Sequence, residues 1–81
     1  MSEPSSRQQQ DLRTEIDRLD GEIQRLIGER AERVLDIARL KEAGGGPFYR
    51  PGREARVLDR VAERNRGPLP DADVVRIFRE I

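Results

Sequence analysis

The sequence predicts an all-α fold of three helices, one of them very long, that pairs with a second copy of itself in an intertwined homodimeric helical bundle. Two observations lead to this prediction. In the first half of the chain the apolar residues recur at alternating spacings of four and three, the period of a helix with one apolar face. Clusters of glycine and proline at residues 44–47 and 65–68 divide the chain into three segments.

The first helix is expected over residues 9–43, after a polar, disordered tail at residues 1–8. It should end where three glycines and a proline follow, because these residues do not continue a helix. We call its apolar stripe the seam. The seam consists of Leu12, Ile16, Leu19, Ile23 and Leu26.

Two shorter helices are expected over residues 51–65 and 71–81. Pro51 suits a first helical turn, and Asp71 is a good N-cap. No glycine, asparagine or basic residue caps the helix that reaches Ile81, so we expect either a truncated form of a longer helix or a frayed terminal turn. The second helix is expected to bury Ala55, Leu58, Val61 and Ala62, and the apolar stripe of the third is expected to consist of Val74, Val75, Phe78 and Ile81.

The length of the first helix predicts the second copy of the chain. About 35 residues at about 1.5 Å each span about 50 Å, more than the diameter of a compact domain of this size. The two short helices can shield roughly half of the apolar stripe. The remainder is therefore expected to pack against the same helix of a partner subunit.

Composition limits the classes of function. Sixteen basic and 16 acidic residues give a net charge of zero, which does not favour binding to nucleic acid or to an anionic membrane. The absence of Cys and His excludes disulfides, thiolate and imidazole chemistry and the usual zinc sites, so we expect no metal. No secretory signal or membrane-spanning stretch is present, and a soluble cytoplasmic protein is expected.

Charged residues interrupt the seam. The heptad spacing places Arg30 and Arg33 on it, where an unpaired guanidinium would cost several kcal/mol. Lys41 follows Arg30 by eleven residues, which returns it to within about 20° of the same helix face. The two cations are therefore expected to converge on one anion, unless Glu29 or Glu32 pairs with Arg30 instead.

Three further residues extend this cationic site. Arg13 precedes Arg30 by seventeen residues, about 25 Å along a helix, so it can join the same ligand only from the partner subunit of an antiparallel dimer. Arg53 and Glu54 add a cation and a hydrogen-bond acceptor in the first turn of the second helix. From periodicity alone, an ordinary surface position remains the more common role of Arg13, Arg53 and Glu54.

Four stretches carry a family signature: LRTEIDRLD at 12–20, ERAE at 29–32, ARLK at 38–41 and FYRPGREA at 48–55. In order and spacing they resemble the all-helical chorismate mutases, over nearly the whole chain. The similarity is greatest to mutase domains at the N-terminus of bifunctional prephenate dehydratases. Domains fused to the first enzyme of the shikimate pathway are also similar.

The resemblance implies a cofactor-free isomerase that converts chorismate to prephenate in phenylalanine and tyrosine biosynthesis. It implies that Arg30 binds a substrate carboxylate, that Lys41 donates a hydrogen bond to the ether oxygen, and that Arg53 helps to hold a carboxylate. Glu54 and the backbone near Arg50 would hold the ring hydroxyl.

The resemblance also implies that Arg13 of the partner subunit completes each of two sites. The third helix of the family continues beyond the position of Ile81 and supplies a Gln or Glu to the ether oxygen, so we expect reduced activity from these 81 residues. A fused or associated prephenate dehydratase or shikimate-pathway enzyme is the expected protein partner.

Two other functions stay open at this point. An isochorismate pyruvate lyase of the same fold would use a similar cationic pocket, and Glu54 favours the mutase only weakly. A non-catalytic helical dimerisation or regulatory module would instead pair its arginines with its own acids. A nucleic-acid-binding coiled coil is disfavoured by the zero net charge.

Overall fold

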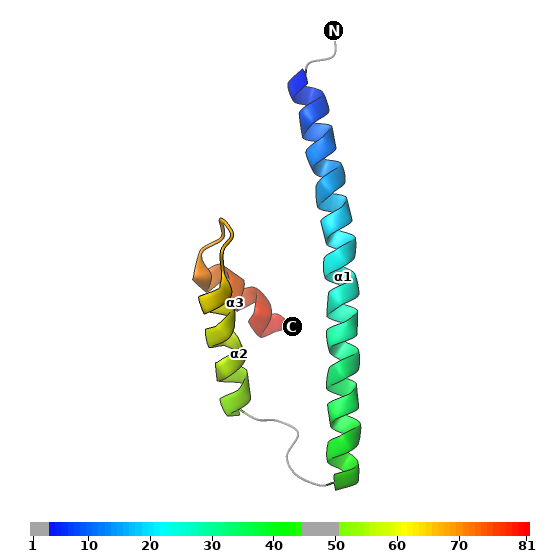
Figure 1. The fold of residues 1–81 in the computed structure, drawn as a ribbon, viewed down its shortest axis with the longest axis vertical. Coiled ribbons are helices and arrows are strands. Elements are labelled where there is room, and N and C mark those ends of the chain that lie inside the picture. The colour runs from blue at the N-terminus through cyan, green and yellow to red at the C-terminus, as the bar shows by residue number, and fades with distance from the viewer. Residues whose placement is uncertain (1–3, 45–50) are drawn as a thin grey trace. The chain divides into compact units, whose positions relative to one another are not determined.

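The alternating apolar spacing of the first half of the chain produces one long helix. A computed structural model of the chain describes residues 4–44 and 51–81. It contains α1 (Pro4–Gly44), α2 (Pro51–Arg64) and α3 (Asp71–Glu80), as Figure 1 shows, and the described residues include no strand. The predicted all-α chain of three helices, one of them very long, is confirmed.

The structure differs from the prediction at the start of α1. The helix begins at Pro4 rather than at residue 9, so residues 4–8 are helical where a disordered tail was expected. Proline fits a first helical turn because the N–H that it lacks would have no partner there. No further proline occurs before residue 47, and nothing in between terminates the helix before Gly44.

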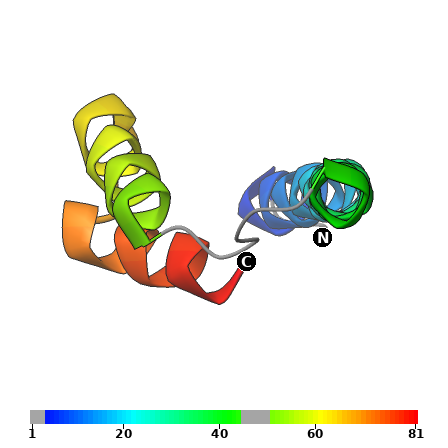
Figure 2. The same ribbon diagram turned by 90° about the horizontal axis from the view of Figure 1, so that it is seen from below.

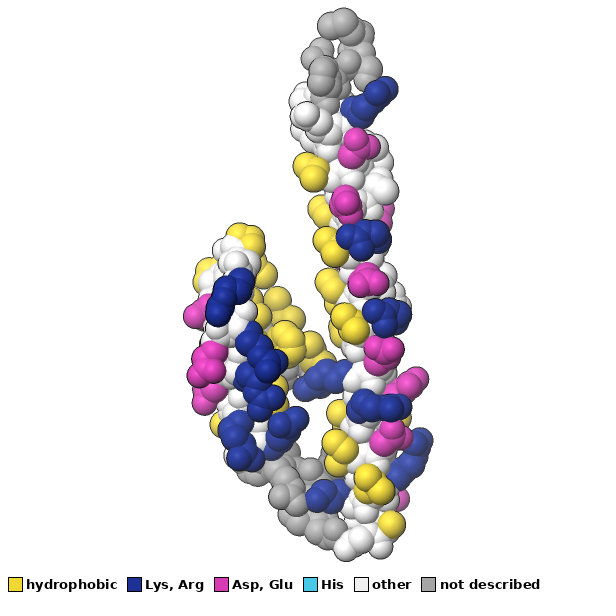
Figure 3. Space-filling model, in the orientation of Figure 1, with side chains coloured by type: hydrophobic (Ala, Val, Ile, Leu, Met, Phe, Trp, Pro, Cys, Tyr) yellow, Lys and Arg dark blue, Asp and Glu magenta, His cyan; other side chains and the backbone are white. Residues whose placement is uncertain are grey.

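In Figure 3 apolar side chains follow one edge of the upper part of α1, and charged side chains lie beside them on the visible face. This edge is solvent-exposed: the exposed fraction is 63% for Leu12 and 51% for Leu26. Across residues 5–44 and 52–81 no side chain is buried, so the described part of the chain has no closed core. The apolar edge of α1 is therefore a surface that still has to be covered.

The α2 and α3 helices pack against each other and lie side by side in both views of the ribbon (Figures 1 and 2). Ala55, which was expected to be buried, is exposed, and so are Phe78 and Ile81 of the apolar stripe of α3, because two short helices cover only the side chains along their line of contact. The half-buried apolar residues of this pair are Val57, Leu58, Val61, Ala62, Val74 and Val75.

The half-buried side chain of Asn65 organises the turn between α2 and α3. Its Nδ2 donates hydrogen bonds to the carbonyl oxygen of Leu69 and to Oδ1 of Asp71, both at 2.8 Å. Its Oδ1 accepts a bond from the backbone N–H of Gly67 at 3.4 Å. One amide side chain therefore joins the end of α2 to the turn and to the start of α3.

The start of α3 corrects the predicted cap. The N-cap residue is Pro70 and not Asp71, and no side chain caps the helix. The backbone N–H groups of Asp73 and Val74 donate to the Pro70 carbonyl at 3.0 and 3.2 Å. Asp71 is the first helical residue, and its carboxylate accepts the bond from Asn65. A negative charge at this end of the helix remains favourable to the helix dipole.

We expect Asn65→Ala to lower the free energy of unfolding by about 1–2 kcal/mol, because three hydrogen bonds are lost together at a half-buried position. Urea unfolding followed by circular dichroism measures the change. Gln24→Ala is the matched control, because it removes an exposed amide that bonds no other residue in the described part of the chain. Equal midpoints for the two variants would contradict this role of Asn65.

Candidate functional site

The cations of the candidate site lie on two helices. Arg50, whose backbone was predicted to take part, falls outside the described residues. The remaining predicted residues are Arg13, Arg30 and Lys41 on α1, and Arg53 and Glu54 in the first turn of α2.

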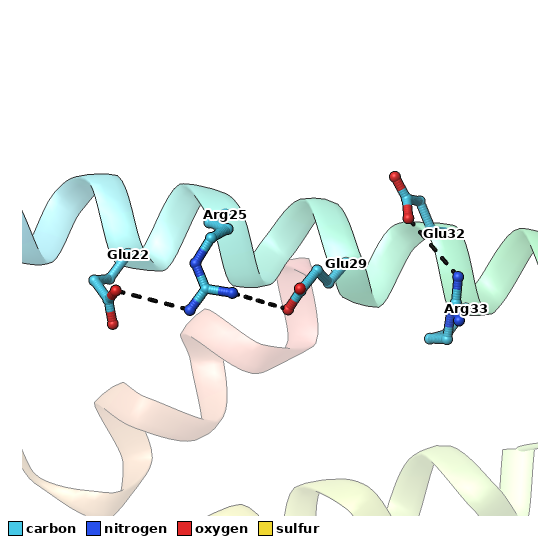
Figure 4. Close-up of polar contacts among 5 residues, drawn as sticks. All are labelled: Glu22, Arg25, Glu29, Glu32 and Arg33. Carbon is cyan, nitrogen blue, oxygen red and sulfur yellow. Dashed lines mark hydrogen bonds and ion pairs between the residues drawn. The ribbon is translucent and has the colours of Figure 1, made fainter.

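Arg30 is surrounded in sequence by acids that other arginines bind. Oε2 of Glu29 accepts a hydrogen bond from Nη1 of Arg25 at 3.2 Å, and Oε2 of Glu32 lies 3.7 Å from Nη2 of Arg33 (Figure 4). The guanidinium of Arg30 makes no hydrogen bond or ion pair with any residue of 4–44 or 51–81. The alternative in which Glu29 or Glu32 pairs with Arg30 is therefore not formed.

The structure distinguishes the two arginines that the spacing placed on the seam. Arg33 pairs with Oδ2 of Asp36 at 3.1 Å in addition to Glu32. Glu29 is also spaced i,i+4 from Arg33, but it bonds Arg25 instead. Of the two seam arginines, only Arg30 therefore lacks an acidic partner among the described residues.

The apolar row resumes beyond the two arginines. Ile37 and Leu40 continue the alternating spacing, with exposed fractions of 48% and 71%. Leu26 and Val34 are the i−4 and i+4 neighbours of Arg30 and lie on its side of the helix. A guanidinium among apolar neighbours attracts an anion more strongly once this surface is covered and water is excluded.

Lys41 differs from the other cations in its environment. It is half-buried, whereas Arg13, Arg30 and Arg53 are exposed. It lies in the last turn of α1, where a positive charge is favourable to the helix dipole. Lys41 has no acidic partner in the described part of the chain. Its ammonium therefore retains donors for an oxygen atom of a ligand.

Within each helix the candidate residues stay apart. Arg30 follows Arg13 by seventeen positions of α1, and the consecutive residues Arg53 and Glu54 leave α2 about 100° apart. No hydrogen bond or ion pair among the described residues joins Arg13, Arg30, Lys41 or Arg53 to another side chain. Each of these cations keeps its hydrogen-bonding capacity for an external anion.

A further set of cations on α2 was not recognised from the sequence. Arg56, Arg60 and Arg64 follow Arg53 at spacings of three, four and four residues, so all four share one helix face. The signal was present in the sequence as this spacing. It was missed because charged residues at helical spacing are also typical of an ordinary solvated face.

The described helices carry neither a bilayer-spanning stretch nor a metal-binding cluster. Although α1 is long, charged side chains recur in its turns, and no apolar segment of membrane-spanning length occurs in the described residues. No three potential metal ligands gather anywhere within residues 4–44 and 51–81.

Comparison with known proteins gives a consistent result. The family model for chorismate mutase type II matches residues 12–81. A bifunctional chorismate mutase/prephenate dehydratase from Neisseria gonorrhoeae is 51% identical over 69 residues, which cover 85% of this chain and 18% of the relative. A protein of the same name from Pseudomonas aeruginosa is 47% identical over 75 residues, 86% of this chain and 20% of the relative. This chain thus spans about a fifth of the length of these relatives.

A solved structure matches almost the entire chain. The structure of chorismate mutase (form I) from Thermus thermophilus superposes with a TM-score of 0.87 at 41% sequence identity. The match covers 90% of this chain and 91% of the Thermus chain. The similarity therefore extends over all three helices and is not limited to α1.

Proposed function

The chain belongs to the chorismate mutase type II family, and from this premise we propose that it rearranges chorismate to prephenate as an intertwined homodimer. The reaction is a unimolecular Claisen rearrangement that needs neither a nucleophile nor a proton transfer. A chain without Cys or His therefore lacks no group that the chemistry requires. Catalysis then rests on positioning and electrostatics.

The observation that carries this proposal is the charge of Arg30, which lies on an apolar helix face and has no acidic partner in the described part of the chain. Neighbouring acids are within reach, yet Arg25 and Arg33 bind them. A cation without an acidic partner among the described residues is expected to meet an anion elsewhere once the surface is covered, because an isolated buried charge is costly. A substrate carboxylate fits this position, since a guanidinium can donate two parallel hydrogen bonds to it.

Lys41 is the second catalytic residue that we propose. As the C–O bond of the substrate stretches, negative charge grows on the ether oxygen. An ammonium fixed beside that oxygen stabilises the transition state more than the ground state. The half-buried position of Lys41 supports this role, because a less hydrated charge acts more strongly on its neighbour.

The first turn of α2 is proposed to hold the other end of the substrate. Arg53 would bind a carboxylate, and Glu54 with the backbone of Arg50 would bind the ring hydroxyl. Clamping both carboxylates holds the enolpyruvyl group over the ring and removes rotational freedom before the reaction. The exposure of Arg53 and its lack of an acidic partner in the described residues support this assignment.

A second copy of the chain is proposed to cover the seam and to complete the site. The exposed apolar edge of α1 supports the first part, because a stripe of this length is stable in water only when it is covered. Arg13 supports the second part. It lies about 25 Å from Arg30 along the same helix, so Arg13 of the partner subunit is the one that an antiparallel arrangement brings to the ligand.

We also propose a cytoplasmic location and a prephenate dehydratase, fused or associated, as the protein that uses the product. The relatives from Neisseria and Pseudomonas support the proposed link to a prephenate dehydratase, because their names combine both activities. Direct transfer of prephenate would then be the advantage of keeping the two domains together.

The proposed function is tested by incubating the 81-residue protein with chorismate and, separately, with isochorismate. We expect prephenate from chorismate and no pyruvate from isochorismate. Chromatography with standards of each product identifies them. Pyruvate from isochorismate would favour the lyase, and no turnover or thermal shift with either compound would favour a non-catalytic module.

We expect Arg30→Gln to lower kcat/KM for chorismate by about 10²–10³-fold, because it removes a donor aimed at the substrate. Arg33→Gln is the matched control. It makes the same charge change three residues away, on a side chain that is already paired with Asp36. Steady-state kinetics of both variants measure the difference. Equal losses from the two substitutions would sink the assignment of Arg30.

Site sharing between subunits predicts complementation. Lys41→Ala and Arg13→Ala should each be inactive as homodimers, because each removes one group from both sites. After equimolar unfolding, mixing and refolding, about a quarter of the wild-type activity should return, since half of the dimers are mixed and half of their sites are intact. Activity of the mixture no higher than the mean of the parents would contradict the assignment of Arg13 to the partner subunit.

A further inference from the structure

Four arginines form a row along α2, which we call the arginine row: Arg53, Arg56, Arg60 and Arg64. Helical geometry places them within an arc of about 80° and over about 17 Å of helix. All four side chains are exposed. In Figure 3 basic side chains follow one edge of α2, and acidic side chains gather on another.

The members of the row have no acidic partners among the described residues. None of them makes a hydrogen bond or ion pair with a residue of 4–44 or 51–81, although Asp59 and Glu63 lie on the same helix. Several arginines elsewhere in the described chain are paired instead. Ion pairs hold Arg18, Arg25 and Arg33 on α1, and Arg76 on α3.

The spacing of these arginines destabilises α2. Arg56 and Arg60 are spaced i,i+4, and so are Arg60 and Arg64. Like charges at this spacing repel each other and destabilise a helix. Exchange of one arginine for a glutamate would remove the repulsion and create ion pairs. The row is therefore better explained by a role in binding than by a role in folding.

We propose that the arginine row captures the dianionic substrate from solution and guides it to Arg53, an inference that rests on the proposed function. Successive members stand about 6 Å or less apart along the axis, which is shorter than the screening length of about 8 Å at physiological salt. Their fields therefore overlap into one continuous positive strip. One end of this strip is Arg53, which is proposed to hold a substrate carboxylate.

A small dianion fits the row better than a polyanion does. The row occupies one helix of 14 residues, and the whole chain has no net charge. Attraction to a long nucleic acid scales with the number of phosphates that a surface neutralises, and a strip of this length offers few contacts. A substrate with two carboxylates, in contrast, can pass from one guanidinium to the next and remain paired.

The test compares two double variants with equal changes in charge. Arg60→Gln with Arg64→Gln removes half of the row and leaves Arg53 in place. The control, Arg18→Gln with Arg25→Gln, removes two arginines of α1 that are ion-paired. Stopped-flow association of a bicyclic diacid that mimics the transition state is recorded from low to high ionic strength.

We expect the row variant to associate about three- to tenfold more slowly than wild type at low salt. The difference should vanish at high salt, where the row is screened. The dissociation rate and kcat at saturating chorismate should not change. The control should keep the wild-type association rate, and circular dichroism should show that α2 is retained in both variants.

Two results would overturn the inference. One is an association rate, and a salt dependence, equal to those of the control. The other is a fall in kcat at saturating chorismate, which would place these arginines in the chemical step. The single variants Arg60→Gln and Arg64→Gln keep the test decisive if the double variant does not fold. Failure of the proposed function is recognised separately, because wild-type protein would then neither bind the diacid nor produce prephenate.

Discussion

The apolar edge of α1 is the constraint on which the other features depend. The helix runs for 41 residues, and the large apolar side chains of its seam are about half exposed. Hydrophobic burial is the dominant favourable term in folding, so a chain that leaves this edge open needs a second surface to cover it. A partner copy supplies that surface in the proposed dimer, and it explains why a candidate site can be assembled from residues as distant along α1 as Arg13 and Arg30.

The ion pairs show which charged side chains are bound within the chain and which remain available to bind a ligand. On α1 the acids that flank Arg30 are bound by Arg25 and Arg33, so the seam arginine among apolar neighbours is the one without a partner in the described residues. Each exposed pair contributes only about 0.2–1 kcal/mol to stability. Their greater effect is to decide which cation remains available to an anion. On α2 the same logic leaves the whole arginine row without partners among residues 4–44 and 51–81.

Errors in the predicted structure came from positions where several local partners compete. Asp71 has the residue type of an N-cap, but Asn65 bonds its carboxylate and Pro70 occupies the cap position. Glu29 has arginines at i−4 and i+4, and spacing alone could not choose between them. Residues 4–8, which were expected in a disordered tail, are helical, because polar residues with adequate helix propensity extend a helix that is already nucleated.

The three helices, the apolar edge of α1 and the cations that interrupt it could all be predicted from the amino-acid sequence. These features follow from periodicity and from glycine and proline, which act within a few residues. The three-dimensional structure was needed to show which neighbouring acid pairs with each arginine of α1, and how Asn65 ties α2 to α3. Such choices depend on side-chain geometry and on contacts between separate elements, where energies of about 1 kcal/mol select one of several equally spaced partners.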